Sequence, residues 1–135
     1  MAVWFESKPV RLEIELDLMR RHHPQARLLL RNKKLIVFKR VRGRQQVYTF
    51  RIEFADDHPY SCPRAYAIEP ETVRGTPHNI PSHSNRLCLF PPSMAGPHLS
   101  GKVILDWVEA WTMDYEQYRE TGRWPERHRD ASDPK

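Results

Sequence analysis

The feature that most constrains the fold is an alternation of side-chain character over residues 46–54. Four large apolar or aromatic side chains alternate there with four smaller or more polar ones: Tyr48, Phe50, Ile52 and Phe54 against Val47, Thr49, Arg51 and Glu53. A period of two indicates a β-strand with one buried face. Strand-like runs also occupy residues 26–31, 35–41 and 64–68, and short connectors between the first three strands suit hairpins. Together these segments predict a four-stranded antiparallel meander.

A helix is expected before the meander. Apolar residues at helical spacing run along it: Val10, Leu12, Ile14, Leu16, Leu18 and Met19. Ser7 is placed to cap this helix, Pro9 suits its first turn, and Pro24 ends it.

A second helix is expected near the C-terminus, over residues 102–120. One broad face of it is apolar and aromatic: Ile104, Trp107, Val108, Trp111, Tyr115 and Tyr118. Ser100 is placed to cap it, and Gly122 followed by Pro125 ends it. We interpret the aromatic residues as core rather than as a cofactor site. With the meander, the two helices predict an α+β fold.

Periodicity disappears over residues 69–101, which contain the prolines Pro70, Pro77, Pro81, Pro91, Pro92 and Pro97. The segment is about twice as long as an unstructured connection in a compact domain usually is. Binding and catalytic groups concentrate on ordered loops that a rigid scaffold holds. The sequence therefore predicts a functional loop here.

Composition predicts one folded domain. The chain has 135 residues, of which 39% are hydrophobic and 29% charged, which is typical of globular rather than disordered proteins. We expect one domain over residues 1–125 and a polar tail over residues 126–135. No apolar stretch approaches the roughly 20 residues of a membrane span, and the N-terminus does not resemble a secretory signal. A cytoplasmic location is therefore expected, where reducing conditions keep Cys62 and Cys88 as free thiols.

The most informative pattern surrounds Cys88. His78 lies ten residues before it, a Leu-Cys-Leu run is centred on it, and a proline- and tyrosine-containing loop at residues 58–63 follows the third strand. This ordered set resembles the ubiquitin-conjugating enzymes over residues 7–125. The closing residues 115–125 resemble the short stand-alone bacterial members found in anti-phage signalling (CBASS) operons or in bacterial ubiquitin-like operons.

The resemblance implies a ubiquitin-conjugating-like cysteine transferase of anti-phage defence. Cys88 would carry the C-terminus of a partner protein as a thioester and pass it to an acceptor. The implied partners are a cyclic-nucleotide synthase or a ubiquitin-like protein, and an activating enzyme. An amide of Asn79 or Asn85 would stabilise the oxyanion intermediate by about 3 kcal/mol, and His78 would fix the loop. No cofactor, metal ion or membrane is implied.

Two departures from the family pattern limit what is implied. The family's asparagine stands eight residues before its cysteine, whereas Asn79 stands nine before Cys88, which leaves Asn85 as an alternative donor. The acidic residue that some members use to orient an attacking lysine has no clear counterpart in this chain. The resemblance therefore implies thioester formation and does not extend to direct transfer to lysine.

Other interpretations remain open beside this one. The chain is also compatible with a non-catalytic protein-binding module on the same fold. A set of possible zinc ligands exists, without any compact ligand pair: His78, His83, Cys88 and His98. Basic segments at residues 39–44 and 123–129 suit nucleic acid, but no aromatic residues interleave with the arginines of the first segment. Apolar neighbours also permit an inert, buried Cys88, and for Cys62 a structural role is the preferred interpretation.

Overall fold

The computed structural model describes residues 3–73, 75–90, 92–94 and 96–125. Its elements in chain order are α1 (Trp4–Ser7), α2 (Pro9–His22), β1 (Arg27–Arg31), β2 (Lys34–Arg42), β3 (Val47–Glu53), β4 (Arg64–Glu69), β5 (Asn79–Ile80), β6 (Arg86–Leu87) and α3 (Gly101–Thr121). Two short 3-10 helices, Pro81–His83 and Pro92–Met94, lie on either side of β6. The predicted α+β class is confirmed. No helix in the described ranges is both long and apolar enough to cross a membrane.

The six strands form one antiparallel sheet in the order β1-β2-β3-β4-β6-β5. Strands β1 to β4 confirm the predicted meander. The sequence did not predict β5 and β6, because two residues each are too few for an alternation to be visible. In these strands Asn79 pairs with Leu87 and Ile80 with Arg86. The predicted functional loop is therefore tied into the sheet rather than lying outside it.

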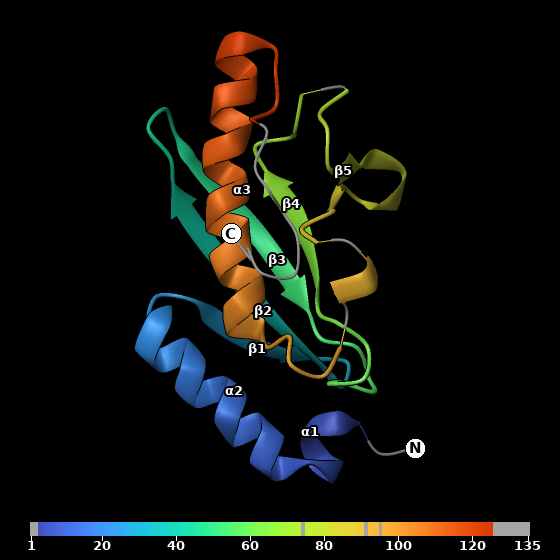
Figure 1. Ribbon diagram of the computed structural model, residues 1–135. Coiled ribbons are helices and arrows are strands. Elements are labelled where there is room, and N and C mark those ends of the chain that lie inside the picture. The colour runs from blue at the N-terminus through green and yellow to red at the C-terminus, as the bar shows by residue number, and fades with distance from the viewer. Residues whose placement is uncertain (1–2, 74, 91, 95, 126–135) are drawn as a thin grey trace.

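Helix α3 lies across one face of the sheet, and α2 lies near β1 and the start of α3 (Figure 1). The alternation predicted for β3 is confirmed, since Tyr48, Phe50 and Ile52 are buried and the residues between them are half-buried. Phe50 meets Trp111 of α3 edge to face, with ring centroids 5.9 Å apart. Burying a side chain of this kind contributes about 2 kcal/mol or more. Within the described residues, no helix covers the opposite face of the sheet.

Both ends of α3 are as the sequence predicts. The Ser100 hydroxyl accepts a hydrogen bond from the backbone N–H of Val103 at 3.3 Å, which makes it the N-cap. Gly122 ends the helix with a positive φ of 76°, and its N–H donates to the carbonyl of Tyr118 at 2.7 Å. These two caps fix the position of the helix that backs the sheet.

The prediction for the first helix is wrong in two details. Ser7 ends α1, and α2 starts without a side-chain cap. Val10 and Ile14 are 67% and 46% exposed, whereas Glu15 and Met19 of the same helix are buried. The buried face is offset from the predicted apolar line because the Glu15 carboxylate is hydrogen-bonded to groups in the interior. A buried hydrogen-bonded carboxylate is not visible in an apolar pattern.

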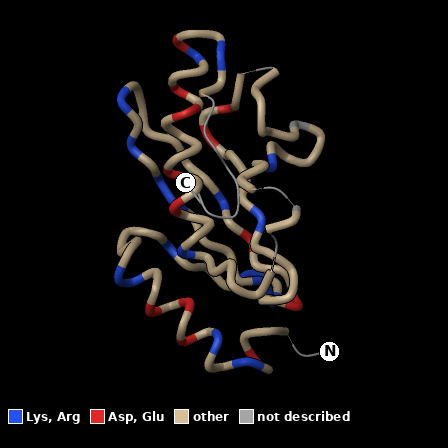
Figure 2. The backbone as a smooth tube through the Cα atoms, in the orientation of Figure 1, with Lys and Arg blue, Asp and Glu red and all other residues tan. Residues whose placement is uncertain are grey.

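The basic segment at residues 39–44 is partly neutralised by α3. Lys39 Nζ lies 3.6 Å from Glu109 Oε2, and Arg44 Nη2 lies 3.5 Å from Glu120 Oε1. Figure 2 shows basic residues of the β2–β3 hairpin beside acidic residues of α3. Two of the four basic residues of this segment are therefore paired within the protein, whereas Arg40 and Arg42 are exposed, which weakens the nucleic-acid interpretation without excluding it. The predicted tail over residues 126–135, with most of the second basic segment, lies outside the described residues.

Candidate functional site

Cys88 is exposed directly after β6, between two buried leucines. Leu87 and Leu89 are 5% and 4% exposed and belong to the core, whereas the thiol-bearing side chain is exposed. Side chains of an extended chain alternate between faces, so anchoring both leucines turns Cys88 outward. The backbone N–H of Cys88 also donates to the carbonyl of His78 at 3.0 Å. The interpretation of Cys88 as a buried residue is therefore wrong.

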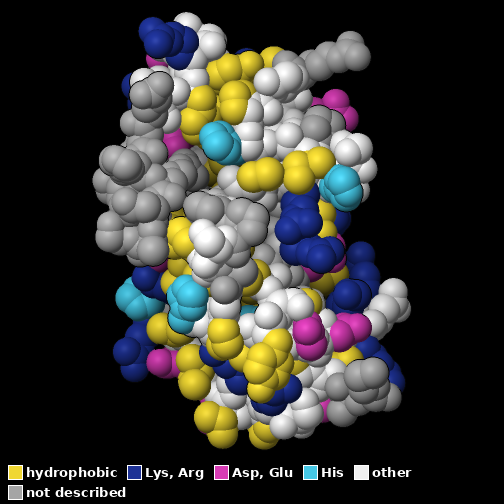
Figure 3. All heavy atoms as spheres, turned by 45° about the vertical axis from the view of Figure 1, so that its right-hand side comes forward, with side chains coloured by type: hydrophobic (Ala, Val, Ile, Leu, Met, Phe, Trp, Pro, Cys, Tyr) yellow, Lys and Arg dark blue, Asp and Glu magenta, His cyan; other side chains and the backbone are white. Residues whose placement is uncertain are grey.

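A cavity of about 440 Å³ opens beside Cys88. Residues 60–65 form one wall, residues 86–90 form another, and Ile80 of β5 contributes between them. Its volume lies within the range of ordinary ligand sites. Figure 3 brings this side of the molecule forward and shows basic side chains next to hydrophobic ones. The proline- and tyrosine-containing loop and the Leu-Cys-Leu run, distant in sequence, thus meet at one hollow.

Cys62 lines the same cavity as Cys88. Its side chain is half-buried and packs against the hydrophobic core. The sequence did not indicate that the two thiols share a cavity, because the loop that carries Cys62 has no periodicity from which to place it. The structural role of Cys62 stays a prediction, and its position makes it a matched control for Cys88.

The side-chain amides of Asn79 and Asn85 lie close together, because both lie within hydrogen-bond distance of the Thr72 hydroxyl. The sequence did not single out Thr72. The Thr72 hydroxyl lies 3.2 Å from Asn79 Oδ1 and 3.3 Å from Asn85 Oδ1. A hydroxyl has one proton, so it donates to one amide oxygen at a time. The Nδ2 atom of Asn79 is buried and has no hydrogen-bond partner among the described residues. The two predicted oxyanion donors are therefore neighbours, and one of them has an unused donor.

His78 has a left-handed backbone conformation, with φ of 55°. Such a conformation is uncommon for a residue with a side chain and persists where surrounding contacts hold it. The His78 ring lies 5.2 Å from the ring of Trp124, and the His78 carbonyl accepts the hydrogen bond from Cys88. Both contacts are made by the loop that precedes Cys88, and the loop-fixing role of His78 stays a prediction.

A buried pair supports the cavity wall from within. His58 Nε2 lies 2.7 Å from Glu15 Oε2, and neither side chain has exposed surface. Glu15 Oε1 accepts a second hydrogen bond from the backbone N–H of Gly101 at 2.8 Å. The His58 ring packs edge-on against Trp4 and Phe54, each at 4.7 Å. Glu15 thereby joins α2, the start of the loop at residues 58–63 and the start of α3.

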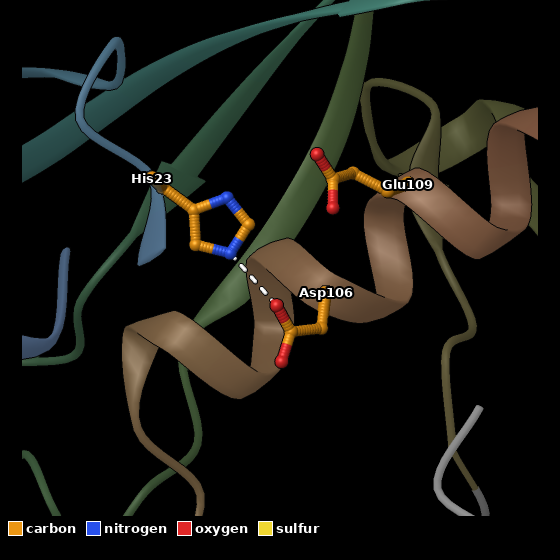
Figure 4. A group of neighbouring side chains, drawn as sticks. All are labelled: His23, Asp106 and Glu109. Atoms are coloured by element: carbon orange, nitrogen blue, oxygen red, sulfur yellow. Dashed lines mark hydrogen bonds and ion pairs between the residues drawn. The ribbon is translucent and has the colours of Figure 1, made fainter. Parts of the chain in front are cut away.

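The four possible zinc ligands do not form a metal-binding group in the described part of the chain. The three donors that do lie within 4.8 Å of one another are His23, Asp106 and Glu109 (Figure 4). His23 Nε2 lies 2.8 Å from Asp106 Oδ1. Each carboxylate also faces an ammonium group, with Lys102 2.5 Å from Asp106 and Lys39 3.6 Å from Glu109. This is the pattern of an ion-pair network that joins the end of α2 to α3.

A family match identifies the chain. The family described as Type II CBASS E2 protein matches residues 15–131, which include the meander, the cavity and Cys88. Neither a curated protein nor a solved structure gives a significant match. Of the two bacterial settings that the sequence suggested, the match selects CBASS. The chain therefore belongs to the Type II CBASS E2 protein family and has, as this membership implies, an E2-like role in anti-phage CBASS signalling.

Proposed function

We propose that Cys88 carries the C-terminal acyl group of a partner protein as a thioester. The observation that supports this most is an exposed thiol held between two buried leucines at the edge of a cavity of about 440 Å³. A group that must accept an acyl chain has to be accessible, yet fixed in direction. The partners we propose are CBASS components, namely a cyclic-nucleotide synthase whose C-terminus is carried and an activating enzyme.

The proposed step is an exchange of thioesters. The Cys88 sulfur, as thiolate, attacks the carbonyl carbon of a thioester on the activating enzyme, and a tetrahedral intermediate forms with negative charge on oxygen. The intermediate collapses by breaking the bond to the donor sulfur, which leaves as thiolate. One carbon–sulfur bond forms and one breaks, so no further reactant is required at this step.

The oxyanion of that intermediate requires a hydrogen-bond donor, and we propose an amide of Asn79 or Asn85. The Nδ2 of Asn79 has no acceptor within the described ranges. Because Asn79 is the register partner of the buried Leu87, its side chain lies on the Leu87 face, and its amide has to turn toward the Cys88 face to reach the oxyanion. A donor that forms its bond only in the intermediate stabilises that intermediate selectively. His78 is proposed to hold the loop rather than to act as a base, because the incoming thioester is already activated.

The proposal is tested by reconstituting the reaction with the proteins encoded beside this one. A covalent adduct should appear on a non-reducing gel and disappear after treatment with a thiol reductant. Cys88→Ala should abolish the adduct, whereas Cys62→Ala, altered in the same cavity, should retain it. An adduct that survives in Cys88→Ala contradicts the proposal. Binding of the partner without any adduct supports the non-catalytic module instead.

A further inference from the structure

The charged residues that line the cavity beside Cys88 are all basic. Two arginines, Arg64 and Arg86, line it, and no acidic residue does. Neither arginine forms an ion pair with another described residue. Arg51 on the neighbouring strand differs, because it lies 2.7 Å from Glu53 and over the ring of Tyr66. Glu53 is the register partner of Arg64, but its carboxylate is paired with Arg51, so the guanidinium groups of Arg64 and Arg86 are available to an anionic ligand.

The strand register places both arginines on the side of the thiol. Tyr66 of β4 pairs with Arg86 of β6 in an antiparallel ladder. Arg64 lies two residues before Tyr66, and Cys88 two residues after Arg86, so alternation puts all four side chains on one face. That face is the one opposite α3. Arg64 is exposed and Arg86 half-buried, so both can reach a ligand in the cavity.

The rest of the cavity is largely apolar. Tyr60, which is 69% exposed, Pro63, Ile80 and Phe90 all line it. An apolar hollow of about 440 Å³ accepts a short segment of chain rather than a folded domain. A suitable ligand thus combines an apolar segment with a carboxylate, and its reactive end must lie at Cys88.

We propose that this cavity selects the C-terminal tail of the carried protein by an acidic side chain close to its last residue. This inference rests on the proposed function, because it assumes that the tail ends at the Cys88 sulfur. The terminal carboxyl of an activated tail is a neutral thioester, so the arginines require a different carboxylate. An aspartate or glutamate a few residues upstream pairs with Arg64 and Arg86, in the planar geometry that guanidinium and carboxylate share.

Synthetic peptides test this directly, without an activating enzyme. Short peptides with a C-terminal alkyl thioester would differ only in glutamate or glutamine near the C-terminus. Acylation of Cys88, which releases the alkyl thiol, would be followed by intact mass. At subsaturating peptide and low salt, the glutamate peptide should react about tenfold faster. Arg64→Gln and Arg86→Gln should each remove most of that preference.

Two further variants complete the design. Arg40→Gln is the matched control, because Arg40 is exposed on β2 and does not line the cavity; it should keep the full preference. A double charge reversal, Arg64→Glu with Arg86→Glu, should transfer the preference to a peptide with lysine at the same position. Thermal unfolding of each variant would show whether it is folded. If the half-buried Arg86 cannot be replaced without unfolding the protein, Arg64→Gln, at an exposed residue, is the decisive variant.

The same peptides as C-terminal amides separate this inference from the proposed function. Their binding to Cys88→Ala would be measured by fluorescence anisotropy. A glutamate preference in binding, without acylation of the wild-type thiol, supports the acidic-tail inference and contradicts the thioester proposal. Acylation of Cys88 at equal rates by both thioester peptides overturns the acidic-tail inference and leaves the thioester proposal standing. Equal binding of both amide peptides also overturns the acidic-tail inference.

Discussion

The carboxylate of Glu15 and the imidazole of His58 lie 2.7 Å apart, and neither side chain has exposed surface. The same carboxylate accepts hydrogen bonds from Arg11 Nε and from the backbone N–H of Gly101. Removing one partner of a buried polar pair leaves the other without compensation for its lost hydration. This pair therefore anchors the start of the loop at residues 58–63, most of which lines the cavity.

Replacing Glu15 with alanine should lower the free energy of unfolding by about 3 kcal/mol. The matched control is Glu13→Ala, because Glu13 lies on the same helix and is exposed; its effect should stay within about 0.5 kcal/mol. Urea unfolding of both variants would measure the difference. Equal unfolding midpoints for the two variants would show that the buried pair does not support the fold.

A second buried carboxylate gives stability a dependence on pH. Glu116 of α3 accepts hydrogen bonds from the backbone N–H groups of Arg44 and Gln45, at 2.8 and 2.9 Å, and from the Tyr48 hydroxyl at 3.1 Å. Burial raises the pKa of Glu116, but the backbone bonds from Gln45 and Arg44 and the bond from Tyr48 outweigh burial and hold the pKa below its usual value. Burial also raises the pKa of Tyr48, and the Glu116 charge adds to this.

A carboxyl with a lowered pKa in the folded state stabilises that state at pH values above the unfolded pKa, about 4.3 for glutamate. That stabilisation is lost as pH falls through the folded pKa. At neutral pH the free energy of unfolding should therefore be larger for the wild-type protein than for Glu116→Gln. This difference in free energy, the gap, should narrow below about pH 4. Urea unfolding at several pH values measures this gap. A constant gap for Glu116→Gln would contradict the assignment.

The sequence predicts the elements whose side chains alternate or repeat over several turns. The alternation around Phe50 predicts β3, and the aromatic face around Trp111 predicts α3 with both caps. The buried face of α2 could not be predicted in this way, because it is set by Glu15 through partners distant in sequence. Strands β5 and β6 were missed because two residues carry no period.

The residues of the candidate site also differ in whether a local sequence pattern could predict them. The sequence draws attention to Cys88 through its neighbours, and the exposure of Cys88 follows from the burial of Leu87 and Leu89. Thr72 could not be singled out, because it lies in a segment without periodicity. Arg64 could not be singled out either, because only the pairing of β4 with β6 places it beside the thiol. Long-range register, rather than local pattern, determines the surroundings of the thiol.

The two thiols should differ in reactivity toward a neutral alkylating reagent. Cys88 is exposed and Cys62 is half-buried in the same cavity, so access alone should make Cys88 react several-fold faster. Brief labelling with iodoacetamide followed by peptide mass spectrometry would measure both rates in one sample. Preferential labelling of Cys62 would reverse the assignment of the accessible thiol.

Variants around Cys88 should change the rate of thioester formation and the melting temperature to different extents. Loss of an oxyanion donor should slow thioester formation by about 100-fold or more with little change in melting temperature, and this is expected for Asn79→Ala or Asn85→Ala. Thr72→Val removes the hydroxyl that joins the two amides and should slow the same step. His78→Ala should mainly lower the melting temperature. If both asparagine variants transfer at the wild-type rate, the donors are backbone amides.

The most direct measurement uses Cys88→Ser with the partner and the activating enzyme. A hydroxyl at this position would form an oxyester, which a thiol reductant does not cleave and strong base does. Tandem mass spectrometry of a digest should place the partner's C-terminal residues on the side chain at position 88, and Cys62→Ser should still form the reductant-sensitive thioester. An adduct mapped to any residue other than position 88 would contradict the claim that Cys88 carries the acyl group. The claim would also be contradicted if both the wild-type protein and a folded Cys88→Ser protein formed no adduct.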